Sequence, residues 1–181
     1  LFSQIADVNY INYNRQLAVE HLMNLQNIDG SWSWYNGMVG NISVTADILE
    51  SLLRIKSMVG VNFNDNINRM ILSSFNFLKD EVENYYKTDK EENNLVNEEN
   101  ALPQFLVKYL YICTLDPSLK FNDEINSYYI EKLKESASSL DIYQKSLSAV
   151  IFHKSGFPDQ ANQFIESLIQ YTVYSKELGR Y

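Results

Sequence analysis

Apolar residues recur at spacings of three and four along almost the whole chain, and this pattern predicts a succession of amphipathic helices. The widest apolar stripe falls in residues 44–59, and its width suggests a helix that is buried on two sides. Seven helices are predicted, over residues 12–26, 44–59, 65–82, 102–114, 123–137, 141–156 and 159–174. No strand is predicted.

The scarcity of helix breakers supports an all-α fold. Glycine occurs six times and proline three times among 181 residues, whereas 45% of the residues are hydrophobic. Most predicted connections are short, so sequential helices should pack as antiparallel hairpins. A hairpin unit that recurs roughly every 40 residues is compatible with a solenoid or with part of an α/α toroid.

The length of the chain suits one domain with a substantial core and is short for two. We therefore expect a single helical domain over residues 1–181. The chain starts with leucine and shows no signal peptide, so we expect it to be a fragment of a larger multidomain protein.

The charge of the chain limits its partners. A formal net charge of -8 creates a field that repels phosphate backbones, so nucleic acid is not an expected partner. No run approaches the roughly 18 consecutive apolar residues of a membrane span, and we expect no direct membrane insertion.

The stretch between the first two predicted helices has the most distinctive residues, LQNIDGSWSWYNGM. Asp29 and Gly30 predict a turn, because glycine adopts positive φ without a Cβ penalty. Trp32 and Trp34, spaced by two, should lie on the same side of an extended segment and bury against the helix ends. Exposed tryptophans could instead form a platform for a sugar or a peptide. Asn41 or Ser43 is the expected N-cap of the helix that follows.

Other polar and reactive residues give weaker signals. Residues 79–100 are polar, and we interpret their middle as a solvated connection; they lack the alternating ligands and central glycine of a calcium loop. Cys113 lies on an apolar stripe, as buried and inert thiols do. His21 has no partner nearby in the sequence, and His153 and Ser155 are two apart on a helix and so do not share a face. We expect no catalytic residue, cofactor or metal in this chain.

Gln26, Gly30 and Trp32 form the pattern Gln-x-x-x-Gly-x-Trp. This pattern resembles the QW repeat at the hairpin turns of α/α-toroid proteins, among them terpene cyclases and the thioester domains of alpha-2-macroglobulins. The longer string LQNIDGSWSWYNGM is similar to the corresponding segment of bacterial alpha-2-macroglobulin-like proteins. Further similarity lies in VKYLYIC at 107–113, YQKSLSAVIFHKSG at 143–156, QANQFIESL at 160–168 and the terminal ELGRY.

This resemblance implies a toroid of alternating inner and outer helices. It also implies a parent endopeptidase inhibitor in the cell envelope, in the periplasm or at the outer-membrane or cell surface, which binds and entraps proteinases. The partners would be those proteinases and the neighbouring domains of the parent chain. The structural motif would be Gln26, Asp29, Gly30, Trp32 and Trp34.

The thioester of this family is not carried over to this chain. The family's thioester motif is of the Cys-Gly-Glu-Gln type, but Cys113 is followed by Thr114, Leu115 and Asp116. The alternative function is an α/α-toroid enzyme such as a terpene cyclase or a prenyltransferase. Such enzymes need an Asp-rich motif or a zinc site, and the sequence has no DxDD run.

Overall fold

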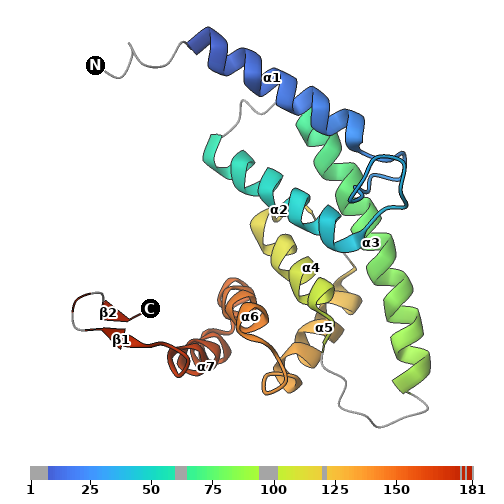
Figure 1. Cartoon of the computed structure of the whole chain (residues 1–181). Coiled ribbons are helices and arrows are strands. Elements are labelled where there is room, and N and C mark those ends of the chain that lie inside the picture. Colours follow the sequence, from blue (N-terminus) through green and yellow to red (C-terminus); the bar gives the residue numbers. More distant parts are fainter. Residues whose placement is uncertain are drawn as a thin grey trace. The chain divides into compact units, whose positions relative to one another are not determined.

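The computed structural model describes residues 8–59, 65–93, 102–119, 122–175, 177 and 179–180. These residues form helices and one minimal strand pair (Figure 1). The helices are α1 (Val8–Leu25), α2 (Ile42–Val59), α3 (Asp65–Asn93), α4 (Gln104–Leu115), α5 (Asp123–Glu135), α6 (Ile142–Lys154) and α7 (Pro158–Ile169). The all-α class predicted from the periodicity is therefore confirmed.

The last predicted helix is shorter than expected. It was predicted to continue to residue 174, but α7 ends at Ile169. The chain then forms two strands of two residues each, β1 (Tyr174–Ser175) and β2 (Gly179–Arg180), which pair antiparallel. This small hairpin was not predicted, because two residues are too few to show an alternating pattern.

Contacts divide the chain into two compact units, Leu1–Leu78 and Lys79–Tyr181. The division falls inside the continuous helix α3. A single domain over residues 1–181 stays a prediction, and each unit is described separately below.

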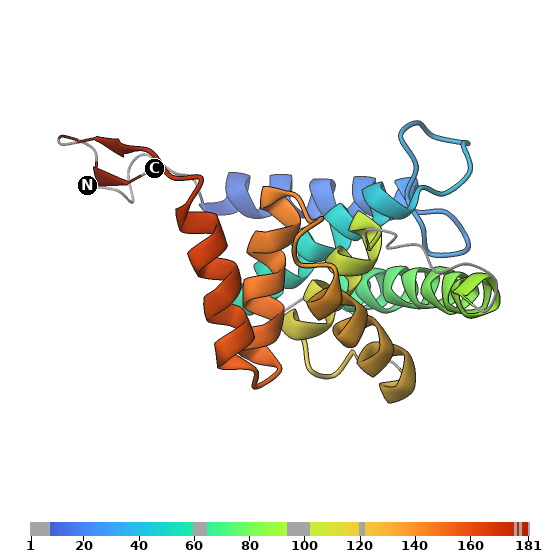
Figure 2. The same cartoon turned by 90° about the horizontal axis from the view of Figure 1, so that it is seen from below.

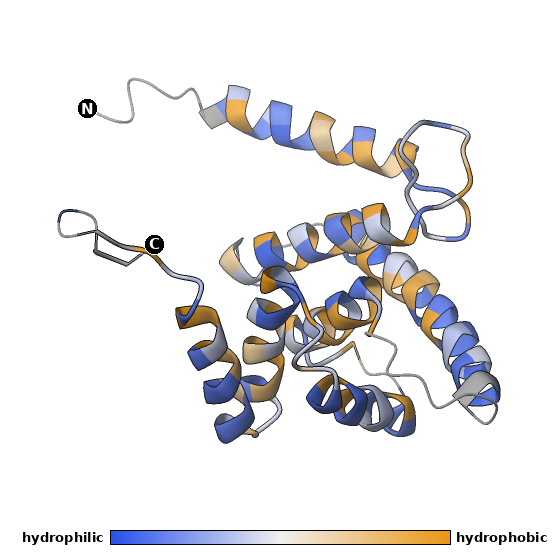
Figure 3. Cartoon of the chain, turned by 60° about the horizontal axis from the view of Figure 1, so that its bottom comes forward, coloured by the Kyte–Doolittle hydropathy of each residue, from blue (hydrophilic) through white to orange (hydrophobic). Residues whose placement is uncertain are grey.

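The first unit contains α1, α2 and the first half of α3. Its buried side chains include Trp32, Leu49, Leu53, Met70 and Phe75. Helix α1 contributes fewer buried side chains to this unit than its predicted apolar face suggests. Figure 3 shows hydrophobic and hydrophilic residues mixed around this helix, and its Leu17 side chain is exposed.

The second unit contains the end of α3 and helices α4 to α7. Helices α6 and α7 form an antiparallel hairpin (Figure 2), and α4 packs against both α5 and α6. The aromatic rings of Phe152 and Phe164 stack across the hairpin, with centroids 5.5 Å apart. The α6–α7 pair therefore has the hairpin arrangement predicted from its short connection.

Side-chain caps start α2, where the sequence predicts one, and α6. The Asn41 Oδ1 accepts a hydrogen bond from the Val44 amide at 3.0 Å, so Asn41 and not Ser43 caps α2. Asp141 and Gln144 form a reciprocal capping box at the start of α6, with bonds of 2.7 and 3.2 Å. Pro103 is the N-cap residue of α4, which has no side-chain cap.

The interpretation of the middle of residues 79–100 as a solvated connection is wrong as far as Asn93, because helix α3 continues to that residue. Residues 94–100 lie outside the described part of the chain. The helix extends beyond Val82 because the stripe of buried side chains on one of its faces continues with aromatic residues. Tyr85 packs edge-on against Phe105 of α4, with ring centroids 5.4 Å apart.

The polar end of α3 is held by an ion pair to α5. The Lys132 Nζ lies 2.7 Å from each carboxylate oxygen of Asp89. Burial by itself would lower the pKa of Lys132, but hydrogen bonds with Asp89 and Tyr128 raise it above its ordinary value. Asp89, which lies in a segment whose polar sequence predicts exposure to solvent, thus links α3 to α5.

Candidate functional site: the Gln26–Trp32 turn

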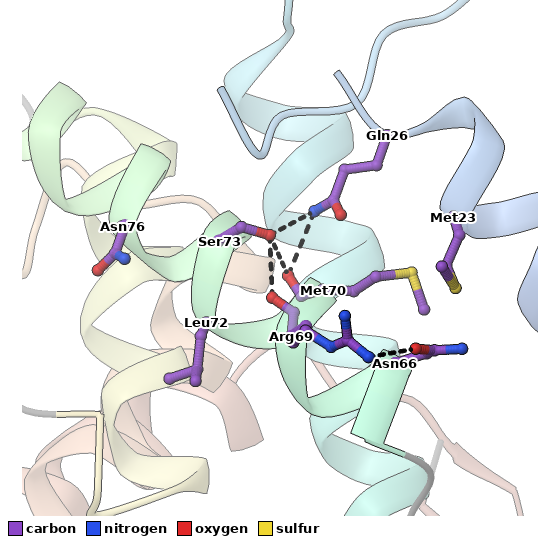
Figure 4. Close-up of a pocket in the computed structure, with 8 residues that line it drawn as sticks. All are labelled: Met23, Gln26, Asn66, Arg69, Met70, Leu72, Ser73 and Asn76. Carbon is purple, nitrogen blue, oxygen red and sulfur yellow. Dashed lines mark hydrogen bonds between the residues drawn. The ribbon is translucent and has the colours of Figure 1, made fainter. Parts of the chain in front are cut away.

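The residues that follow α1 form a compact turn, which we call the Gln26–Trp32 turn and which lies wholly within the first unit. Gln26 is the first residue after α1, and its side chain extends to Met70 and Ser73 on α3 (Figure 4). Its Nε2 lies 2.9 Å from the carbonyl oxygen of Gly30 and 3.0 Å from the Ser73 Oγ. The Ser74 Oγ and the Met70 carbonyl oxygen are also within reach, at 3.1 and 3.3 Å.

An amide nitrogen carries two hydrogens, so these four acceptors share two donated bonds. Whichever two of the four acceptors receive these bonds, Gln26 stays hydrogen-bonded to the turn or to α3. The side chain of Gln26 therefore acts as a link between the end of one helix and the middle of another.

Gly30 is required by both its backbone angle and its surroundings. Its φ is +89°, in the region that favours glycine. A Cβ added to it would lie 2.3 Å from the carbonyl oxygen of Ser73, which belongs to the backbone of α3. The absence of a side chain therefore lets the turn approach α3 closely.

Trp32 fixes the turn to both neighbouring helices. Its side chain is 2% exposed, and the indole Nε1 donates to the Leu22 carbonyl oxygen of α1 at 3.2 Å. Its backbone amide donates to the Thr45 Oγ1 of α2 at 2.9 Å. The predicted burial of this tryptophan against the helix ends is confirmed.

The predicted burial of Trp34 is wrong. Its side chain is 70% exposed, and the neighbouring Tyr35 and Met38 are exposed as well. The two tryptophans do not share a side, because residues 34–38 form bends and turns and not an extended strand. The spacing-of-two rule applies only where the backbone is extended.

Asp29 orders the turn from the solvent side. Its Oδ1 accepts from both the amide and the hydroxyl of Ser31, at 3.0 and 2.6 Å. These hydrogen bonds lower the pKa of the Asp29 carboxyl below its ordinary value, with the Ser31 hydroxyl as the largest cause. Asn27 completes the network through its Nδ2, which donates to the Ser31 Oγ at 3.0 Å.

Replacement of Ser31 by alanine should raise the pKa of Asp29 toward the ordinary aspartate value of about 3.9. At pH values above the pKa that Asp29 has in the unfolded chain, the lowered pKa stabilises the folded state. This stabilisation is lost as the pH falls through the pKa that Asp29 has in the folded chain. Carboxyl-carbon NMR titration of Asp29 in wild type and in Ser31→Ala measures the shift directly. An identical titration midpoint in the two proteins would contradict this role of Ser31.

An open pocket of about 430 Å³ lies beside the Gln26 link. Figure 4 shows its lining residues, which come from the end of α1 and from α3. The Arg69 guanidinium donates to the Asn66 Oδ1 at 2.9 Å, and the Ser73 hydroxyl donates to backbone carbonyl oxygens of α3. The side chains of Gln26, Arg69 and Ser73 in this pocket thus make hydrogen bonds within and between helices, as structural groups do.

Several partners of the turn were not anticipated from the sequence. Ser73, Ser74 and Thr45 lie far along the chain from Gln26 and Trp32, and single serines and threonines carry no distinctive pattern. Gly40 was also missed. A Cβ on Gly40 would lie 2.0 Å from the Ser31 Oγ, so a second glycine is needed for close packing.

The other candidate residues belong to α1 and to the end of α6. His21 is exposed on α1, and His153 and Ser155 are exposed at the end of α6. The Ser155 amide donates to the His153 carbonyl oxygen, but no hydrogen bond joins their two side chains in the described part of the chain. Residues 8–59, 65–93, 102–119 and 122–175 contain no group of three or more His, Cys, Asp or Glu side chains placed to hold a metal. Among the described helices, none is long and apolar enough to cross a membrane.

Burial raises the pKa of the Cys113 thiol to about 11. The rate of alkylation by iodoacetamide should therefore increase about tenfold per pH unit from pH 7 to near pH 10, because the thiolate is the nucleophile. A pH–rate profile under native conditions checks this expectation, with the unfolded chain as control. A plateau near pH 9 in the native protein would show an ordinary, unburied thiol.

Comparison of the chain with protein-family models, with curated proteins and with solved structures finds no match.

Proposed function

We propose that this chain is a non-catalytic helical domain of a longer, bacterial alpha-2-macroglobulin-like endopeptidase inhibitor, in which it helps to bind and entrap proteinases. The observation that carries the proposal is that the residues of the Gln-x-x-x-Gly-x-Trp motif contact the neighbouring helices. Gln26, Gly30 and Trp32 all make internal contacts, with α3, α2 and α1. Because the motif residues make contacts inside the domain, they support a scaffold role for the turn.

The toroid belongs to the same proposal. Support comes from the antiparallel α6–α7 hairpin and from the tight helix-to-helix turn around Trp32. The choice of family rests on sequence resemblance, in LQNIDGSWSWYNGM and in the segments at 107–113, 143–156 and 160–168. On this proposal the parent resides in the cell envelope, and the contacts of this domain are with proteinases and with neighbouring domains.

Entrapment predicts a particular dependence on substrate size. A proteinase enclosed by the inhibitor still meets small peptides, but large protein substrates are excluded sterically. The parent protein is incubated with a bulky general proteinase, and hydrolysis is then followed with casein and with a chromogenic tripeptide in parallel. The expected result is loss of casein hydrolysis with most of the tripeptide hydrolysis retained.

Two controls make this test specific. An inert protein of similar mass should leave both activities unchanged, and a small active-site inhibitor should abolish both. Equal loss of casein and tripeptide hydrolysis with the parent would contradict entrapment, and unchanged casein hydrolysis would contradict proteinase binding.

A further inference from the structure

The connection between α1 and α2 contains a second tight turn, which we call the Asn36–Gly37 turn. The Met38 amide donates to the Tyr35 carbonyl oxygen at 3.2 Å, so Asn36 and Gly37 are the two central residues of this turn. Gly37 has a φ of +83° and no described non-glycine residue has a positive φ, which corresponds to a type II turn. Both central residues are exposed, and no atom lies within 4 Å of a Cβ added to Gly37. The turn therefore stands in open space.

Two groups of the Asn36–Gly37 turn that can react with each other make no hydrogen bond. The bond that closes the turn uses the Met38 amide, and the Gly37 amide has no acceptor among the described residues. The side chain of Asn36 likewise has no hydrogen-bond partner in the part of the chain that the structure describes. Neither group has to break a contact before the two approach each other.

An asparagine followed by glycine is the pair with the least hindered route to ring closure. The amide nitrogen of the second residue and the side-chain Cγ of the asparagine close a five-membered ring, and glycine has no Cβ beside the attacking nitrogen. Asn36–Gly37 is the single Asn-Gly pair among the 181 residues of the chain. Sequence and local structure therefore select the same asparagine.

We propose that Asn36 is a self-modification site, at which water replaces the side-chain amide. The Gly37 nitrogen attacks the Asn36 Cγ, the N–Cγ bond forms, and the Cγ–Nδ2 bond breaks. The Nδ2 atom takes up the proton of the Gly37 amide and leaves as ammonia. Water then opens the succinimide ring: attack at Cγ gives an aspartate, and attack at the main-chain carbonyl carbon gives an isoaspartate. The reaction needs only water and the chain itself, so it is independent of the proposed inhibitor function.

The modification changes the surface of the connection between α1 and α2. Residues 30–46 contain no charged side chain. Either product adds a carboxylate, which is ionised at neutral pH because the ordinary pKa of an aspartate is about 3.9. The new charge lies next to the exposed Tyr35 and close to the exposed Met38. An isoaspartate also adds one atom to the backbone inside the turn, so the charge and the backbone of this surface both change irreversibly with the age of the protein.

Two other asparagines serve as internal controls. The Asn41 Oδ1 accepts a hydrogen bond from the Val44 amide at 3.0 Å, and the next residue is the branched Ile42. Asn126 lies inside α5, where the amide of the next residue, Ser127, is bonded along the helix. In both places the following amide is hindered or held away from the side chain, so we expect both asparagines to persist.

Peptide mass spectrometry of the chain, aged in mildly alkaline buffer, tests the proposal. Asn36 should gain one mass unit at least an order of magnitude faster than Asn41 or Asn126, with isoaspartate as the more abundant product. The rate should fall in mildly acidic buffer, because the deprotonated amide nitrogen is the nucleophile. Equal rates at Asn36 and Asn41 in the native chain would overturn the proposal.

The same chain unfolded in guanidinium chloride measures the effect of the fold. We expect the native rate at Asn36 to lie within an order of magnitude of the unfolded rate, because the turn leaves both reacting groups open. Asn126 should convert faster once α5 is unfolded. A native rate at Asn36 that is more than an order of magnitude below the unfolded rate would show that the fold protects this residue, and would overturn the proposal.

Two variants test the two reacting groups. Asn36→Gln should show no gain of mass at this position over the same period, because glutamine has to close a six-membered ring. Its melting temperature should equal that of the wild type, since the position is exposed. Gly37→Ala places a methyl group beside the attacking nitrogen and should slow the conversion of Asn36 by at least an order of magnitude. An unchanged rate in Gly37→Ala would contradict the succinimide route.

Discussion

Replacement of Trp32 by alanine should lower the free energy of unfolding by about 3–5 kcal/mol, the range for truncation of a buried aromatic side chain. The side chain is 2% exposed, so its removal leaves a cavity beside the ends of α1 and α2. The loss of the indole also leaves the Leu22 carbonyl oxygen without this donor. Both effects act in the same direction.

Urea denaturation followed by circular dichroism measures this loss, and Trp34→Ala is the matched control. Trp34 lies two residues away in the same connection between α1 and α2 and is 70% exposed, so its replacement should change the free energy of unfolding by about 0.5 kcal/mol or less. Equal effects of the two replacements would show that burial of Trp32 does not stabilise the fold.

Replacement of Gly30 by alanine should lower the free energy of unfolding by about 2–5 kcal/mol. A non-glycine residue at positive φ costs roughly 1–2 kcal/mol, and forced overpacking adds typically 1–3 kcal/mol. The overpacking arises because the new Cβ would lie 2.3 Å from the Ser73 carbonyl oxygen. A backbone atom inside a helix cannot move aside as the end of a flexible side chain can.

Gly37→Ala separates the two contributions. Gly37 has a similar φ of +83°, but no atom lies within 4 Å of its added Cβ. Its replacement should therefore cost only the conformational part, about 1–2 kcal/mol. The difference between the two variants, measured by urea denaturation, reports the close approach of the turn to α3, and a difference of zero would contradict that approach.

The helices were predictable because their signals are local. Apolar residues at spacings of three and four located each helix in the described part of the chain, and the cap Asn41 marked the start of α2. Pattern analysis ended α3 too early, because the contacts that extend it lie elsewhere in the chain. Tyr85 is paired with Phe105 and Asp89 with Lys132, and a segment rich in charge and asparagine does not reveal such partners.

The turn was predictable in part. Gly30 and the buried Trp32 follow from residue type, since positive φ favours glycine and a large aromatic favours burial. The partners of Gln26 do not follow, because Ser73 and Ser74 are separated from it by 47 and 48 residues. The exposure of Trp34 depends on bends and turns in residues 34–38, which its spacing from Trp32 cannot show.

We propose that the Gln26–Trp32 turn is a structural element of a non-catalytic domain and not a recognition platform. The most direct test is the size-dependent protection assay, applied to the proposed parent inhibitor carrying Trp32→Ala or Trp34→Ala. We predict that Trp34→Ala retains selective loss of casein hydrolysis and that Trp32→Ala loses it together with thermal stability. Loss of selective protection in Trp34→Ala at an unchanged melting temperature would contradict the claim.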